Sequence, residues 1–269
     1  MNTILEQGID RIDAPLKVTG RATYAFEHQV ESSAYAVLAM SRIAKGRIES
    51  IRTRAAQNSP GVLLVMTHMN APKLSTLQNQ KHNAPTSRVL NVLQDNLVRF
   101  ANQPIGLVVA ETLEQAQEGA RLLKVDYAIE AHHVDLARRA SQGYSPTKAG
   151  GGGDPSISHR GDVESGLKNA AAHLSRVYTT PAEVHNPMEP HATIAVWNAP
   201  NRLTLYDATQ GVSSDQERVA ELLGIPPQNV RVISPYLGEV ASVVRDRFGH
   251  TLSSPRWRRD NSTGPLSWK

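Results

Sequence analysis

Two histidines and a glutamate, His185, Glu189 and His191, lie close together in the segment HNPMEPH. Side chains of these types bind zinc in many proteins. Their spacing differs from the H-E-x-x-H pattern that places ligands on one helix face, and Pro187 and Pro190 prevent a regular helix. The segment therefore predicts no helical zinc site. A loop in which Glu189 pairs locally remains a plain structural alternative.

A second candidate is Gln210, which is followed by Gly211 between a predicted strand and a predicted helix. A side-chain amide can donate and accept hydrogen bonds at once, and glycine lets the backbone approach a ligand closely. An ordinary strand-to-helix loop is the alternative. The four glycines at 150–153 are predicted to be a flexible connector, because a phosphate-binding loop needs a strand before it and a helix start after it.

Alternating and continuous apolar runs predict the elements that position these residues. After an extended lead-in (residues 1–18), where Pro15 disfavours a helix, a first domain spans residues 19–131. Thr112 and Gln115 form a predicted capping box for a helix that runs to about Leu123. A helical turn is predicted at 55–58. Strands are predicted at 34–40, 47–51, 62–67, 104–110 and 124–129.

A linker (residues 132–161) leads to a second domain at 162–238. Its candidate residues lie in loops between predicted elements, and Gly224 is predicted to end its main helix. The predicted elements are a helix at 163–169, a strand at 173–180, a hairpin of 192–197 and 202–206 with loop 198–201, a helix at 212–223 and a strand at 230–233.

Composition excludes several classes of function. The chain has no cysteine, so it holds no disulfide, cysteine-ligated zinc or iron–sulfur cluster. No apolar run approaches the roughly 20 residues of a membrane helix, and we read no signal peptide. Of the net charge of +4, residues 239–269 contribute +3, with six cations against three carboxylates. The rest lacks a basic stripe with aromatics, so we expect no nucleic-acid partner and no membrane.

Four stretches occur in the order and spacing of one known family: DRIDAPLKVTGRATYAFE, PIGLVVAETLEQAQEGARLLKVDY, TTPAEVHNPMEPHATIAVW and LTLYDATQGVSSDQERVAELLGIPPQNVRVISPYLG. Together they resemble the molybdenum-cofactor-binding large subunit of the xanthine dehydrogenase/aldehyde oxidase family, nearest its bacterial aldehyde oxidoreductase branch. The resemblance covers residues 8–238. It implies an α+β fold, in which an α/β hammerhead domain is followed by an incomplete molybdopterin-binding domain.

The resemblance implies that the parent enzyme hydroxylates aldehydes or N-heteroaromatics with oxygen from water, using molybdenum-molybdopterin in its cytosine dinucleotide form. It implies iron–sulfur and FAD partner subunits, and a location in the cytoplasm, or in the periplasm through export with a partner. It also implies that Gln210, Gly211 and Gly238 contact the cofactor, while Glu189 and His191 help to shape the substrate cavity.

The family's catalytic glutamate lies farther along its sequence than this chain extends. We therefore expect this chain to be inactive and not to retain the cofactor. The alternative is a non-enzymatic module that docks on the partner subunits.

The resemblance stops after Gly238, where the family continues with Gly-Gly-Gly-Phe-Gly and this chain has Glu239 and Val240. In a frame that starts at the third base of the Gly238 codon, the bases of residues 239–243 permit that glycine sequence. Later bases permit further family-like segments. We hypothesise that residues 239–269 are a frame-shifted translation ending at a premature stop. We expect them to be poorly ordered, and the incomplete domain to leave an unpaired strand edge.

Overall fold

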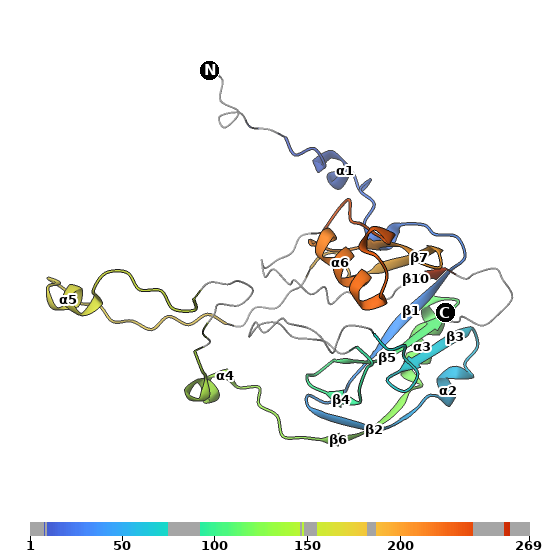
Figure 1. The fold of residues 1–269 in the computed structure, drawn as a ribbon, viewed down its shortest axis with the longest axis horizontal. Helices are drawn as coiled ribbons and strands as arrows, with labels where there is room; N and C mark the ends of the chain where they lie inside the picture. Colours follow the sequence, from blue (N-terminus) through green and yellow to red (C-terminus); the bar gives the residue numbers. More distant parts are fainter. Residues whose placement is uncertain are drawn as a thin grey trace.

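The computed structural model describes residues 8, 10–74, 92–145, 147, 155–181, 187–238 and 256–258. Within these residues the strands form a seven-stranded sheet in the order β3-β5-β1-β10-β7-β8-β9 and a three-stranded sheet in the order β4-β2-β6 (Figure 1). The larger sheet consists of β1 (Ser33–Met40), β3 (Val62–Thr67), β5 (Pro104–Ala110), β7 (Thr193–Ala199), β8 (Arg202–Asp207), β9 (Val230–Ile233) and β10 (Arg256–Arg258). The smaller sheet consists of β2 (Gly46–Arg52), β4 (Leu97–Val98) and β6 (Lys124–Ile129).

The helices are short, and the two longest pack on the larger sheet. They are α1 (Ala14–Val18), η2 (Ala25–Glu27), α2 (Arg54–Gln57), α3 (Leu113–Arg121), α4 (Leu136–Arg139), η3 (Ala140–Gln142), α5 (Val163–Lys168), α6 (Val212–Leu223) and η4 (Pro227–Asn229). In the described part of the chain, none of them combines the length and apolar character that a membrane crossing requires. The mixture of helices and strands confirms the predicted α+β class.

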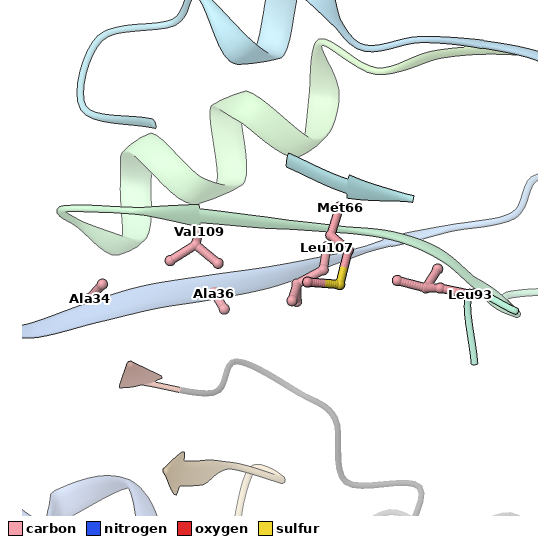
Figure 2. Close-up of a cluster of buried hydrophobic side chains, with 6 residues drawn as sticks. All are labelled: Ala34, Ala36, Met66, Leu93, Leu107 and Val109. Carbon is pink, nitrogen blue, oxygen red and sulfur yellow. The ribbon is translucent and has the colours of Figure 1, made fainter. Parts of the chain in front are cut away.

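The first unit is built on the antiparallel strands β3, β5 and β1, whose side chains alternate between two buried faces. Leu107 and Val109 of β5 join a cluster with Met66 on the face away from α3 (Figure 2). Val108 points to the other face, where an added Cβ on Gly119 of α3 would lie 2.7 Å from its methyl group. The glycine therefore sets how closely the helix packs on the sheet.

The capping box predicted for α3 is confirmed. The Thr112 hydroxyl accepts from the Gln115 N–H at 3.3 Å, and the Gln115 side chain accepts from the Thr112 N–H at 3.1 Å. The strands predicted on either side of this helix also form, but β5 and β6 belong to different sheets. The strand–helix–strand segment is therefore a connection between two sheets and not a crossover within one.

The second unit contains the hairpin β7–β8 and a parallel crossover from β8 through α6 to β9. Leu203, Leu205, Ala220 and Val230 form its core. The helix ends at Gly224, as predicted, because that residue adopts φ +66°, a conformation that glycine reaches without steric cost. The hairpin loop is tighter than the predicted 198–201, since β7 extends to Ala199 and β8 begins at Arg202.

Three sequence predictions are wrong. Pro15 does not prevent a helix: it occupies the first turn of α1, where its missing N–H has no partner to lose. Residues 173–180 form no strand and are exposed, because no described strand pairs with them. Residues 256–258, expected to lack order, form β10 between β1 and β7, whose edges offer unpaired backbone groups. The rest of 239–269 lies outside the described residues.

Candidate functional site

Three loops meet at one end of the β7–β8–β9 sheet. The Gln210 loop (208–211) follows β8 and the Gly238 loop (234–238) follows β9, so both leave the same end of two parallel strands. The Glu189 loop (187–191) enters β7, which is antiparallel to β8 and therefore begins at that end. Each loop contains a residue that was predicted from the sequence as a site candidate, and the strand order brings the loops together.

The Glu189 and Gly238 loops are joined by a short hydrogen bond. The Gly238 N–H donates to Oε2 of Glu189 at 2.6 Å, across 49 residues of sequence. A Cβ added at Gly238 would lie 2.4 Å from the Glu189 Cβ and 3.1 Å from its backbone nitrogen. Only glycine fits there without moving a neighbouring backbone. The other carboxylate oxygen, Oε1, is buried and has no hydrogen-bond partner among the described residues.

The Gln210 loop forms its own small network and stays open to solvent. The Gly211 N–H donates to the Thr209 hydroxyl at 2.9 Å, and the Ser214 hydroxyl donates to the Gly211 carbonyl at 2.8 Å. Gly211 is the N-cap of α6 and supplies no side-chain cap. The Gln210 side chain is exposed, so its amide is open to a polar group from outside. Ser234 connects this loop to the next by donating to the Thr209 carbonyl at 3.2 Å.

Two aspartates that were not predicted as site residues, Asp207 and Asp215, lie next to these loops in the chain. Burial raises the pKa of the Asp207 carboxyl from 3.8 to about 6; the negative charges of Asp215 and Glu189 also raise it, while a hydrogen bond from the Thr193 hydroxyl opposes the rise. Burial also raises the pKa of Asp215, against a hydrogen bond with Thr209.

The sequence did carry a signal for Asp207. It continues the buried alternation of Leu203 and Leu205 on β8, so an acid was placed on an inward face.

These acidic groups bear on whether an anionic cofactor fits. Glu189 already accepts a hydrogen bond from the Gly238 N–H, and the negative charges of Glu189 and Asp215 both act on the Asp207 carboxyl. The exposed Gln210 amide suits a neutral polar group, but the Gly238 end does not suit a phosphate. The described residues therefore do not by themselves form a site for a molybdopterin cofactor.

The remaining candidate residues are His191, His185 and the four glycines at 150–153. His191 is exposed at the end of the Glu189 loop. His185 and the glycines at 150–153 lie outside the described residues. Within the part of the chain that the structure describes, no three His, Cys, Asp or Glu side chains gather in a way that could hold a metal ion.

Comparison with known proteins agrees with the two-unit fold. The family described as aldehyde oxidase and xanthine dehydrogenase, a/b hammerhead domain, matches residues 19–131, and the molybdopterin cofactor-binding domain matches residues 152–239. A quinoline 2-oxidoreductase structure from Pseudomonas putida 86 superposes with a TM-score of 0.66 over 94% of this chain and 34% of that chain. At 22% identity, this likeness supports the fold alone.

Sequence relatives are closer in identity. The aldehyde oxidoreductase molybdenum-binding subunit PaoC of Escherichia coli O157:H7 is 40% identical over 231 residues, which cover 85% of this chain and 30% of the relative. A nicotinate dehydrogenase large molybdopterin subunit of Eubacterium barkeri is 26% identical over 230 residues, which cover 85% of this chain and 52% of the relative. The chain thus spans between about a third and about half of the length of these relatives. It belongs to the xanthine dehydrogenase/aldehyde oxidase family and corresponds to the N-terminal part of that family's molybdenum-cofactor-binding subunit.

Proposed function

We propose that this chain is the N-terminal part of the molybdenum-cofactor-binding subunit of an aldehyde-oxidising enzyme, and that the 269-residue chain has no activity of its own. When bound, the cofactor of such an enzyme supplies the two-electron oxidation that converts an aldehyde and water into a carboxylic acid. N-heteroaromatic substrates are the second possibility within the same chemistry. The cytosine dinucleotide form of the cofactor and the iron–sulfur and FAD subunits belong to the same proposal.

One observation carries the proposal: the Glu189, Gln210 and Gly238 loops converge at one end of β7–β8–β9. The exposed Gln210 amide at this edge offers donors and acceptors to a polar ligand, while the Gly238 N–H is already held by Glu189. The 40% identity to an aldehyde oxidoreductase subunit supports the aldehyde substrate class. The proposed inactivity is supported by the Glu189 carboxylate on the Gly238 N–H, because that backbone group is already occupied.

The test compares this chain with a version whose coding DNA carries a one-base correction at codon 238. Each is expressed with iron–sulfur and FAD subunits of the family and assayed for molybdenum content and benzaldehyde oxidation in ¹⁸O-labelled water. The uncorrected chain should contain little molybdenum and produce no acid, whereas the corrected chain should yield acid that carries the label. Turnover by the uncorrected chain, or labelled acid from neither, would contradict the proposal.

A second candidate is a non-enzymatic module that docks on those partner subunits. It is favoured by large apolar side chains that are exposed before α4 and after α5. Val134, Val177 and Tyr178 are each at least 86% exposed. An exposed patch of large apolar groups is typical of a surface that another polypeptide covers, and Val177 and Tyr178 are adjacent in the chain. Co-purification of the uncorrected chain with either partner subunit would support this role, and its absence would exclude it.

A further inference from the structure

An N-terminal segment, residues 13–28, makes three contacts, two with the Gly238 loop and one with strand β8; we call it the N-terminal brace. The Lys17 ammonium donates to the Leu237 carbonyl at 3.3 Å, across 220 residues of sequence. The Tyr24 ring lies 6.2 Å from the Tyr236 ring at an angle of 56°. His28 stacks on Tyr206 of β8 with ring centroids 4.3 Å apart. The brace therefore follows the Gly238 loop and the adjacent strand.

The brace is itself held in a defined shape. Lys17 forms an ion pair with Asp13 one helical turn earlier, at 3.3 Å. The Leu16 carbonyl accepts hydrogen bonds from two later backbone N–H groups, and the Glu27 carboxylate accepts from the Tyr24 N–H at 2.7 Å. Ala25 of η2 is 2% exposed, and η2 packs on β7 and β8. These contacts restrict where the Lys17 side chain can reach.

Lys17 and Glu189 act on the same peptide group. Leu237 supplies its C=O and Gly238 its N–H, and the partial double bond keeps both in one plane. The Lys17 cation contacts the oxygen at 3.3 Å, while the Glu189 carboxylate contacts the N–H at 2.6 Å. A cation at one end and an anion at the other align with the peptide dipole, and each hydrogen bond polarises the group in favour of the other.

We propose that the N-terminal brace positions the Gly238 loop, and that Lys17 is its positioning residue because it clamps the Leu237–Gly238 peptide against Glu189. The clamp fixes the direction in which the chain leaves β9. Lys17 touches neither substrate nor reacting atoms in this role. The further consequence, that the brace sets the backbone of a cofactor-binding glycine loop, rests on the proposed function. The clamp itself does not.

The experiment measures hydrogen–deuterium exchange of the full chain by mass spectrometry, in the peptide that contains Gly238. Lys17→Met keeps an unbranched side chain but removes the ammonium, and Lys17→Arg restores a cationic donor. Lys45→Met is the matched control, since Lys45 also forms an ion pair, with Glu130 at 3.5 Å, but lies in the first unit. Lys17→Met should speed exchange of the Gly238 peptide about five- to tenfold, as expected for losing one part-buried hydrogen bond of ordinary net strength.

Lys17→Arg should restore slow exchange, and Lys45→Met should leave it unchanged. A change below twofold in Lys17→Met, or equal acceleration by Lys17→Arg, would overturn the clamp. Peptides from β5 report global folding and should stay protected in every variant. If Lys17→Met unfolds them, Tyr24→Ala and Tyr24→Phe replace it. Acceleration by the alanine variant alone would support the brace, and no acceleration by either would refute it.

The exchange result does not depend on activity. A corrected subunit that lacks turnover would count against the proposed function and leave the clamp standing, whereas an unaffected Gly238 peptide would remove the clamp and leave the proposed function standing.

Discussion

Substituting Gly238 by alanine tests the central contact of the candidate site. The new methyl carbon would lie 2.4 Å from the Glu189 Cβ, whereas carbon atoms in contact are normally about 3.5–4.0 Å apart. The two loops must therefore separate by about 1 Å or more. The Glu189 backbone nitrogen, 3.1 Å from the same position, prevents relief by rotation of a side chain alone. The 2.6 Å hydrogen bond to the carboxylate is then lost.

The loss of unfolding free energy in Gly238→Ala has two causes, the overpacking by the new methyl group and the loss of the hydrogen bond to Glu189. Overpacking typically costs about 1–3 kcal/mol, and a hydrogen bond to a charged group contributes about 1.5–3 kcal/mol. Glu189 is half-buried, so solvent recovers part of the second loss, and the two effects overlap because one movement causes both. We expect Gly238→Ala to lower the free energy of unfolding of the second unit by about 2 kcal/mol.

The assay is urea unfolding followed by the fluorescence of Trp197, which packs on the core of the second unit. Trp257 and Trp268 are replaced by phenylalanine in every variant, so that Trp197 alone reports. Gly166→Ala in α5 is the control, since Gly166 has no atom within 4 Å of an added Cβ, and it should not lower the free energy of unfolding.

Combining Gly238→Ala with Glu189→Gly removes the clashing Cβ, so the cost of the alanine should fall in that background. Equal unfolding free energies for Gly238→Ala and Gly166→Ala would refute the reasoning.

Three further predictions concern other parts of the chain. Asp207 binds its proton more tightly in the folded state, since its pKa rises from 3.8 to about 6, so its contribution to stability falls as pH rises from about 4 to 6 and is constant above. In urea unfolding, the free energy of unfolding of Asp207→Asn should therefore rise by up to roughly 3 kcal/mol relative to the parent chain between pH 4 and pH 7. The same pH dependence in both chains would contradict this. Gly119→Ala should destabilise the first unit by about 1–2 kcal/mol in thermal unfolding despite alanine's higher helix propensity, because its Cβ would lie 2.7 Å from Val108; a gain in stability would show that the helix moves freely. The coding DNA, sequenced for roughly 2 kb past codon 238, should show a long family-like reading frame after a one-base correction, that length being a rough estimate for several further domains; without such a frame, the frame-shift hypothesis is wrong.

Local interactions explain what the sequence could predict. The capping box of Thr112 and Gln115 involves residues three apart, and the end of α6 depends on the left-handed conformation of Gly224 alone. The apolar runs that became β1, β3 and β5 are buried whichever strands they pair with, because both faces of this part of the sheet are covered. None of these predictions required knowledge of distant residues.

The strand predictions that were wrong depended on which distant segments pair. Residues 173–180 alternate as a strand does, but a strand is stable only beside a partner, and no described strand lies there. Strand β10 is the opposite case, since its three residues have no strong pattern and pair because the edges of β1 and β7 are available. The sequence indicates which segments can form strands, and the neighbours decide which of them do.

The candidate site combines both kinds of information. The resemblance selected Glu189 and Gly238 separately, for a substrate cavity and a cofactor, and neither selection implied that the two residues touch. Their contact follows from topology: a hairpin and a parallel crossover must bring the start of β7 and the end of β9 to one edge. At this edge the Glu189 carboxylate accepts a hydrogen bond from the Gly238 N–H. Because Gly238 has no Cβ, the Glu189 backbone and side chain can lie close to it. The contact between Glu189 and Gly238 thus accounts for an acid at position 189 and a glycine at position 238 without any cofactor. A cofactor that used this backbone would first have to displace a carboxylate that already holds it.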